Sequence, residues 1–192
     1  MSIRHAYKLF RVSNKDKGKL YPLFVNANKE VPIGVWLEAE CGERKANGKV
    51  KSKLGDLKFR SGWHLCTDPL CTHIGIKGES GNIEFLNPQY VWCECEFSTN
   101  IDYQPIVNEL GRNKQGKIIP KNACMELPPK DGFYKYKTSP NMTGEWIIAG
   151  AIKVNRVLTD EEVRNILTER NLTGLPRYGG DIDLEKFGFK AA

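Results

Sequence analysis

The sequence has no apolar stretch of the length that a membrane-spanning helix requires. Its longest uninterrupted apolar run covers residues 146–152, whereas a span needs about 20 such residues. The N-terminal residues also lack the apolar centre of a secretory signal. We therefore expect a soluble cytoplasmic protein with no membrane partner.

Signatures of several common enzyme classes are missing as well. The sequence contains no glycine-rich phosphate loop, no Gly-x-Gly-x-x-Gly, no Gly-x-Ser-x-Gly and no His-Glu-x-x-His. These absences argue against a P-loop nucleotide hydrolase, a Rossmann dehydrogenase, a serine hydrolase and a zinc protease. No internal repeat is present either, which argues against a solenoid or a propeller.

Neither the net charge nor the number of cysteines identifies one class of protein. The 29 Lys and Arg residues against 23 Asp and Glu residues give a net charge of +6. This favours a phosphate-bearing ligand, but it does not by itself establish nucleic acid as a partner. The six cysteines would form disulfides only in an oxidising compartment, so we expect free thiols.

Short strand-like runs bounded by Gly, Pro or Asn dominate what is present. Residues 91–97 alternate between two faces, and residues 146–158 form a β-branched stretch that Gly150 divides into two strands or bends. The capping-box spacing from Thr159 to Glu162 predicts a helix that follows. The pattern is typical of a single strand-rich α+β domain, with few short helices and one helix near the C-terminus.

Other segments of this single domain, residues 1–192, carry weaker signals. Residues 6–12 and 20–26 predict an N-terminal hairpin. Residues 43–60 hold seven Lys and Arg residues and two acids, which predicts an exposed hairpin or an anion-binding arm. We expect residues 99–143 to form an insertion or lid, and residues 173–192 to wrap irregularly over the body.

The densest reactive cluster lies in residues 62–73, which contain two His and Cys pairs spaced by one residue. Imidazole and thiolate suit zinc, but structural zinc sites favour cysteines separated by two to four residues. Cys93 and Cys95 alternate with polar neighbours and share a face with apolar residues. We therefore predict that both are packed in the core, and we expect no metal.

The same cluster also predicts a strand over residues 63–66, a capping turn at Thr67 and a helical turn over residues 70–74. Such a strand and turn would present His64 and Thr67 to a ligand. The alternative is a simple connection between a strand and a helix, in which Thr67 only caps.

Two charged residues elsewhere can also be interpreted either as ligand-binding or as purely structural. Glu145 precedes the most hydrophobic run of the chain, so it is either a solvated strand-end charge or a fixed acid at the rim of a cleft. Arg11 ends the first predicted strand near Tyr7, and it is either a surface arginine or a guanidinium that clamps a phosphate or a ribose.

Three pieces of sequence, in this order, resemble the ADP-ribosyltransferase-like superfamily. They are Tyr7-Lys-Leu-Phe-Arg11, then Gly62-Trp-His-Leu-Cys-Thr-Asp-Pro69, then Gly144-Glu145-Trp-Ile-Ile with Gly150-Ala-Ile-Lys-Val154. The chain is also similar to short uncharacterised proteins of bacteriophages and mobile elements, which share the Gly-aromatic-His-x-Cys-Thr motif and a strand like Val91-Trp92. A phage origin would imply the cytoplasm of a bacterial host.

The resemblance implies a split sheet that binds NAD as a substrate, in a cleft between the strands of Arg11 and Glu145. Glu145 would be catalytic and stabilise the oxocarbenium-like ribose that forms as nicotinamide leaves. Arg11 would hold a phosphate, and Trp63 or Tyr7 would stack on a ring. The residues so expected to bind NAD are Tyr7, Arg11, Trp63, His64 and Thr67. ADP-ribose would pass to an unknown acceptor, for example a host protein.

The chain also departs from the pattern of that superfamily. Thr143 stands where arginine-modifying members carry Glu or Gln, and the first strand lacks the His-Gly pair of the poly(ADP-ribose) polymerase branch. These departures leave open a non-catalytic phage or mobile-element protein that binds a nucleotide or a host protein. In that case residues 43–60 and 112–121 would supply lysines for the ligand.

Overall fold

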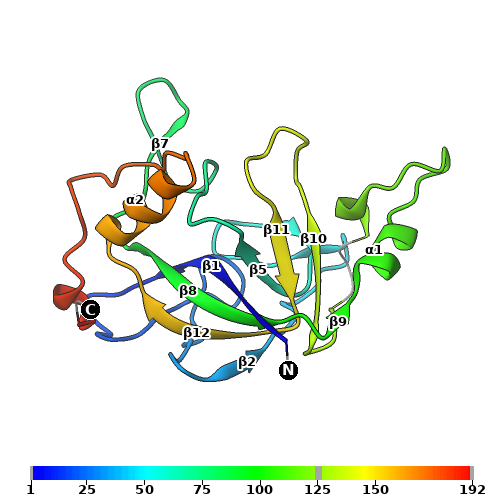
Figure 1. Cartoon of the computed structure of the whole chain (residues 1–192), viewed down its shortest axis with the longest axis horizontal. Coiled ribbons are helices and arrows are strands. Elements are labelled where there is room, and N and C mark those ends of the chain that lie inside the picture. The colour runs from blue at the N-terminus through cyan, green and yellow to red at the C-terminus, as the bar shows by residue number, and fades with distance from the viewer. Residues whose placement is uncertain (1, 124–126, 191–192) are drawn as a thin grey trace.

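An eight-stranded mixed sheet runs through the computed structural model (Figure 1), which describes residues 2–123 and 127–190. Its strands, in spatial order, are β2 (Trp36–Glu38), β12 (Ala151–Val157), β8 (Tyr90–Ser98), β1 (Ile3–Arg11), β5 (Trp63–Cys66), β11 (Trp146–Ala149), β10 (Gly132–Tyr136) and β9 (Ile101–Asp102). Neighbouring strands are antiparallel, except that β9 and β10 run parallel.

The elements outside this sheet are short. They are the hairpins of β3 (Lys49–Val50) with β4 (Leu57–Lys58) and of β6 (Ile76–Lys77) with β7 (Ile83–Phe85), the helices α1 (Gln104–Leu110) and α2 (Asp160–Glu169), and the 3-10 turns η1 (Pro120–Asn122) and η2 (Glu185–Phe187). The strand-rich composition agrees with a single α+β domain. Within the described residues, no helix combines the length and the apolar character needed to cross a bilayer.

The central strand β8 shows why the sheet has a core on each face. Cys93, Cys95 and Phe97 are buried in one apolar cluster, whereas Trp92 on the opposite parity belongs to a second cluster. Because successive side chains of a strand point to opposite faces, this alternation places β8 between the two cores. The strand predicted over residues 91–97 and the packed state of both cysteines are confirmed.

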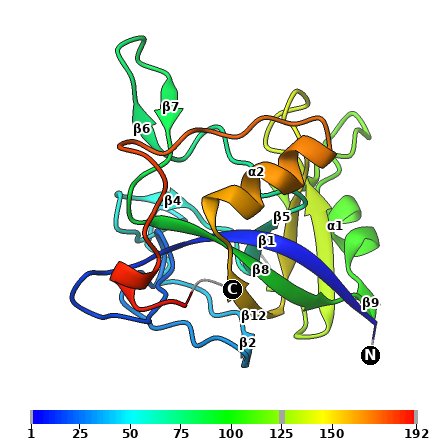
Figure 2. The same cartoon turned by 60° about the vertical axis from the view of Figure 1, so that its left-hand side comes forward.

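The C-terminal helix and the divided strand also follow the sequence prediction. The Thr159 side chain accepts a hydrogen bond from the Glu162 backbone N–H, and the Glu162 carboxylate accepts one from the Thr159 N–H, which completes the capping box. α2 lies over one face of the sheet (Figures 1 and 2). Gly150 separates β11 from β12, and a Cβ at this position would stand 1.8 Å from the Pro129 carbonyl oxygen.

The lysine-rich segment and the N-terminal segment differ in how closely they match expectation. Residues 43–60 contain the hairpin of β3 and β4, as predicted. Residues 20–26 form no strand, and they reach β1 only through the bridge between Arg11 and Tyr21. Pro22 follows that bridge and lacks the N–H that a continuing ladder would use.

One prediction about local structure was wrong, because residues 72–74 form bends and residues 70–74 contain no helical turn. Residues 99–143, which we expected to form an insertion or lid, contain α1, η1, β9 and β10. The N-cap of α1 makes no side-chain hydrogen bond, so the helix carried no capping signal. Cys124, one of the six expected free thiols, lies outside the described residues.

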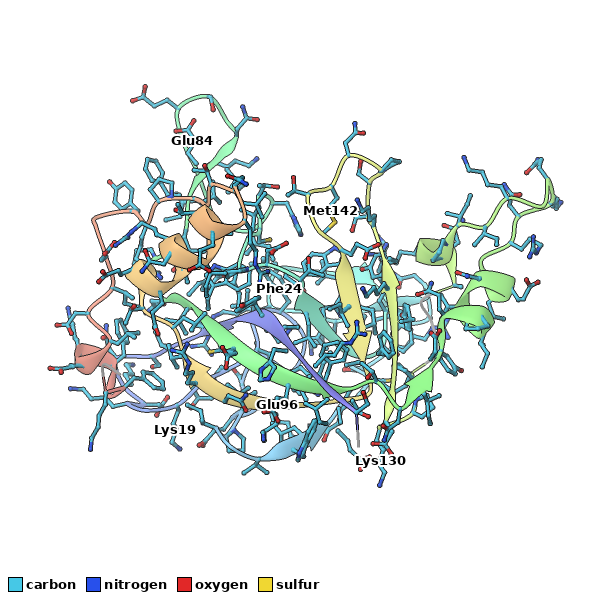
Figure 3. The ribbon with its side chains drawn as sticks, viewed as in Figure 1. Lys19, Phe24, Glu84, Glu96, Lys130 and Met142 are labelled. Atoms are coloured by element: carbon cyan, nitrogen blue, oxygen red, sulfur yellow. The ribbon has the colours of Figure 1, made fainter. Side chains whose placement is uncertain are left out.

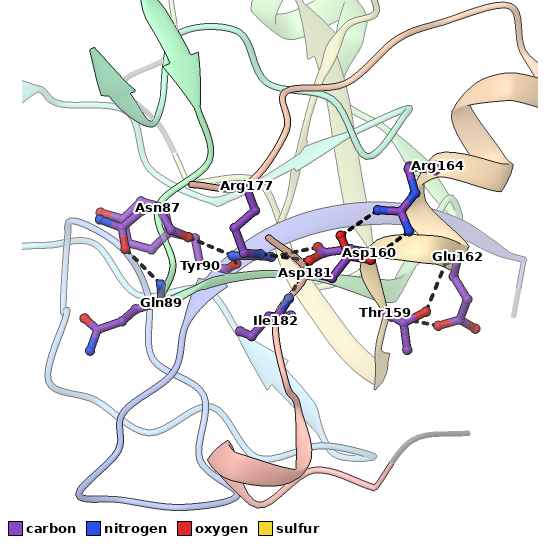
Figure 4. Close-up of polar contacts among 10 residues, drawn as sticks. All are labelled: Asn87, Gln89, Tyr90, Thr159, Asp160, Glu162, Arg164, Arg177, Asp181 and Ile182. Atoms are coloured by element: carbon purple, nitrogen blue, oxygen red, sulfur yellow. Dashed lines mark hydrogen bonds and ion pairs between the residues drawn. The ribbon is translucent and has the colours of Figure 1, made fainter. Parts of the chain in front are cut away.

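The C-terminal segment wraps over the body through one buried ion pair (Figure 4). The Arg177 guanidinium donates to both carboxylate oxygens of Asp160, at 2.8 and 2.9 Å, and to the carbonyl oxygens of Asn87 and Tyr90, at 2.7 and 2.6 Å. Only 4% of the Arg177 side chain and 13% of the Asp160 side chain is exposed. The Ile182 N–H also donates to Asp160, so one carboxylate joins α2 to two parts of the tail.

We predict that Arg177→Met lowers the free energy of unfolding by about 3–5 kcal/mol, because it leaves a buried carboxylate without its cation. The matched control is Arg164→Met, which breaks the bidentate pair with Asp181 on the same helix and tail. Both side chains of that pair are 57% exposed, so the free energy of unfolding of Arg164→Met should stay close to that of the wild type. Urea unfolding measures both; equal losses in the two variants would contradict the prediction.

Candidate functional site

The sheet opens between β1 and β5. The two strands are neighbours but pair at one position, Tyr7 with Cys66, whereas β1 pairs with β8 along its whole length. Beyond that position the Lys8 Nζ donates a hydrogen bond to the His64 carbonyl oxygen at 2.8 Å. The same Nζ lies 5.6 Å from the ring centroids of Phe10 and Trp63. A side chain thus joins the strands where their backbone pairing has ended.

A cavity of about 740 Å³ lies at this opening. All four tryptophans of the chain line it, although they come from β2, β5, β8 and β11. Phe24, which Figure 3 labels near the centre of the molecule, lines it as well. The aromatic residues of the lining are Phe24, Trp36, Phe59, Trp63, Trp92, Tyr136 and Trp146. Such a lining offers flat apolar faces to a planar ring.

His64 is held in this cavity as a neutral imidazole. Its ring meets those of Tyr136 and Trp146 edge-on, with centroids 6.3 and 6.0 Å away. Burial, with the positive charges of Lys8 and Arg60, lowers the pKa of His64 to about 3. The Nδ1 atom is 3.1 Å from the Gly62 carbonyl oxygen. Nδ1 therefore carries the proton of the neutral ring and donates it there, which leaves Nε2 as an acceptor.

Steric constraints explain why the Gly-Trp-His motif begins with glycine. Gly62 adopts φ +116, which L side chains rarely adopt, and an added Cβ would stand 2.4 Å from the Ile148 Cγ2 atom. The glycine lets the chain enter β5 against β11. It therefore fixes where Trp63 and His64 stand.

Two cations of the cavity were not predicted as site residues, namely Lys8 and Arg60. The Arg60 Nη1 atom donates to the Tyr136 hydroxyl at 2.9 Å, and the guanidinium lies 5.0 Å from the centre of that ring. Its buried Nε atom has no hydrogen-bond partner among the described residues. Burial lowers the pKa of Lys8. Arg60 adjoins the Ser-Gly-Trp-His motif in sequence and ends the basic segment 43–60, and these were the two signals for it.

The two buried thiols that line the cavity, Cys66 and Cys71, are protonated at neutral pH. Burial raises the pKa of Cys66 and of Cys71, and it raises the pKa of Cys95 to about 12. The Cys71 Sγ atom is 3.6 Å from the Nδ1 atom of His73, whose pKa burial lowers. Within the described ranges, no three His, Cys, Asp or Glu residues gather as a metal site would require.

Glu145 and Thr67 lie together beside the cavity, outside the residues that line it. The Glu145 backbone N–H donates to the Thr67 Oγ1 atom at 3.4 Å, and the Glu145 carboxylate is 3.7 Å from the Lys135 Nζ. Thr67 directly follows Cys66 in the chain, and Glu145 directly precedes Trp146. Both Cys66 and Trp146 line the cavity. The predicted catalytic acid is therefore one residue beyond the cavity wall.

An arginine of α2 secures the turn that carries Thr67. Arg170 donates to the Thr67 carbonyl oxygen at 2.9 Å and to the Asp68 carboxylate, and its guanidinium lies 5.6 Å from the centre of the Tyr7 ring. The Thr67 hydroxyl donates to Asp68 at 3.1 Å. Tyr7 is thus engaged with this turn and is not among the described residues that line the cavity.

Arg11 lies apart from the other predicted residues. It donates to the Ala27 carbonyl oxygen at 2.9 Å and covers the Tyr21 ring at 4.9 Å. The described lining of the cavity does not include it. The structure therefore brings Trp63 and His64 into the cavity, holds Thr67 and Glu145 beside it, and leaves Arg11 in the N-terminal segment.

Comparisons with known proteins add no assignment to these residues. No protein-family model, no curated protein and no solved structure matches the chain. The case for a function therefore depends on the chemistry of the cavity and on the sequence resemblance.

We predict that His64 makes the fold less stable as the pH falls from 7 to 5. The unfolded chain binds a proton near pH 6.5, whereas folded His64 stays neutral down to about 3. The contribution of His64 to the free energy of unfolding is therefore complete above the pKa that His64 has in the unfolded chain. It declines below that pKa, by about 2 kcal/mol at pH 5. Urea unfolding across this range should show the loss.

His64→Asn should reduce that decline, because an amide keeps the bond to Gly62 but does not titrate. The control is His5→Asn, since the His5 side chain is 59% exposed. If the pH dependence of His64→Asn equals that of the wild type, the buried neutral state is wrong.

Proposed function

We propose that the chain binds NAD or a related nucleotide in the cavity between β1 and β5. The observation that carries this proposal is that all four tryptophans line one cavity together with Lys8 and Arg60. Aromatic faces stack on a nicotinamide or adenine ring, and the cations attract phosphate. The same protein would hold both ends of a ligand that joins planar rings through a pyrophosphate.

The size and the charge of the cavity support a ligand of this class. A volume of about 740 Å³ falls within the range of small-molecule sites. Because His64 is neutral and the neighbouring thiols are protonated, the charge around Lys8 and Arg60 is not cancelled by these groups. The buried Nε atoms of Arg60 and Arg11 both lack a partner among the described residues. Arg60 is the better candidate for the phosphate, since it lines the cavity and Arg11 does not.

We also propose that the sheet is of the split type that the ADP-ribosyltransferase resemblance implies. The support is the single pairing position between β1 and β5, with the cavity at the point where they separate. The order β1-β5-β11 brings the first two resembling pieces and residues 144–148 of the third onto adjacent strands, whereas residues 151–154 lie in β12 beside β8. Arg11 does not fit the phosphate role that the resemblance gives it, and Arg60 takes that role here.

We predict that NAD quenches the tryptophan fluorescence saturably and stabilises the protein against heat. Ligand at about 100 times its Kd should add about 2.7 kcal/mol to the free energy of unfolding. Arg60→Gln should weaken binding at least about tenfold, because a charged hydrogen bond contributes about 1.5–3 kcal/mol.

The matched control for Arg60→Gln is the same substitution at Arg11. If Arg11→Gln weakens NAD binding and Arg60→Gln does not, the assignment of the phosphate to this cavity is wrong. No saturable quenching by NAD, AMP or ADP-ribose would contradict the binding proposal as a whole.

Transfer of ADP-ribose is the second candidate function. The bond between nicotinamide and the ribose carbon would break with its electron pair leaving on nicotinamide, and a nucleophile of the acceptor would then attack that carbon. The Glu145 carboxylate would stabilise the positive charge that develops on the ribose. The support is that Glu145 and Thr67 directly adjoin two cavity residues, Trp146 and Cys66.

For this candidate we predict that the wild type releases nicotinamide from NAD and that Glu145→Gln loses most of the activity, because the amide keeps the shape but removes the charge. Chromatography of the released nicotinamide measures both. Glu169→Gln, an exposed carboxylate near the end of α2, is the control. Equal release by the wild type and Glu145→Gln would contradict the role of Glu145; NAD binding without release would leave a binding protein.

A further inference from the structure

The positive charge of the chain is concentrated in one hairpin. Residues 43–60 hold seven cations and two acids, a net charge of +5 out of +6 for the whole chain. Six of the seven cations are exposed, and the seventh, Arg60, is half-buried in the cavity. Lys45 is paired with Asp56 at 2.6 Å. The remainder of the chain is therefore close to neutral, and the hairpin is its cationic surface.

This basic hairpin is also a wall of the aromatic cavity. Apolar residues of the hairpin line the cavity together with Lys58 and Arg60, while Lys45, Lys49, Lys51 and Lys53 are exposed outside the lining. The hairpin residues in the lining are Val50, Leu54, Leu57, Lys58, Phe59 and Arg60. The hairpin, whose strand β4 is labelled in Figure 2, thus carries exposed cations beside a cavity with an aromatic lining.

We propose that this surface binds a single-stranded nucleic acid, with a nucleobase in the cavity and the adjoining phosphates along residues 43–60. The proposal rests on the proposed function, because it takes the nucleotide bound in the cavity to be one residue of a nucleic-acid strand. Aromatic side chains beside a cationic groove are the two elements by which proteins hold single strands. A duplex does not fit, because its bases are stacked and offer no free face to the tryptophans.

The acids of the cavity do not oppose such a ligand. Three acids line the cavity, and two of them are paired: Glu30 with Lys19, at 2.8 Å, and Glu40 with Lys29. The charge of these two is thus balanced locally. The third, Glu38, is an exposed residue of the edge strand β2. The exposed Leu54 of the hairpin would also suit an anionic membrane, but a membrane would leave the aromatic cavity without a role.

The test is fluorescence anisotropy of a labelled single-stranded oligonucleotide of about a dozen residues, a length within the usual site size. Affinity should fall with salt, and the double variant Lys51→Gln/Lys53→Gln should bind more weakly. Its slope of log K against log salt should be shallower by roughly 1.4, because each lost phosphate contact removes about 0.7. Both lysines are exposed and lie outside the cavity lining.

The matched control is Lys15→Gln/Lys17→Gln, which removes the same charge from the exposed loop after β1, outside the cavity lining. Equal weakening in the two double variants would overturn the proposal, because net charge alone would then explain binding. An abasic oligonucleotide should bind more weakly and leave the tryptophan fluorescence unquenched; equal binding and quenching would likewise overturn it.

Two further outcomes separate this proposal from the proposed function. If NAD quenches the tryptophans but the oligonucleotide does not bind, the nucleic-acid proposal is wrong and the nucleotide site remains. If vesicles containing phosphatidylserine bind through Lys51 and Lys53 while the oligonucleotide does not, the hairpin is a membrane surface and the proposal is also wrong.

Discussion

The hydrogen bond from Lys8 to the carbonyl oxygen of His64 holds the sheet together at the point where it opens. β1 and β5 share one backbone pairing, so without another link their separation would expose unpaired polar groups. A long side chain can span the gap that a backbone N–H cannot reach. The opening is thereby kept without dividing the sheet, and the cavity forms between the two strands.

The same lysine contributes to the electrostatics of the cavity. Burial, together with the charges of Lys8 and Arg60, lowers the pKa of His64. Burial likewise keeps Cys66 and Cys71 protonated. The imidazole and these two thiols therefore add no negative charge beside the two cations. Four tryptophans from four strands line the same cavity.

Local sequence patterns predicted β8, the division at Gly150 and the capped helix α2, because each depends on the periodicity or the capping of nearby residues. They failed for α1, whose N-cap makes no side-chain hydrogen bond, and for β10, whose neighbours in the sheet are remote in sequence. They also failed to identify Lys8, because its partner His64 is brought to it only by the pairing of β1 with β5.

In the candidate site, too, a local motif predicted some of the residues, whereas others are brought together only by the order of the strands. The Gly-Trp-His motif identified Trp63 and His64 correctly as neighbours in one place, since a glycine in an unusual conformation is a local requirement. The gathering of Trp36, Trp92 and Trp146 depends on the strand order and could not be read from spacing. Arg11 illustrates the reverse, because its position in the first strand suggested a ligand but its side chain is engaged with the N-terminal segment.

The most direct test of the central claim is a proton–nitrogen correlation spectrum in which the four tryptophan indoles give separate signals. Titration with NAD should shift several indole signals with one dissociation constant, because all four rings line the same cavity. The amide signals of α1, whose residues lie outside the described lining, should stay in place. Indole signals that remain unmoved at millimolar NAD, or shifts confined to the Arg11 segment, would contradict a nucleotide site between β1 and β5.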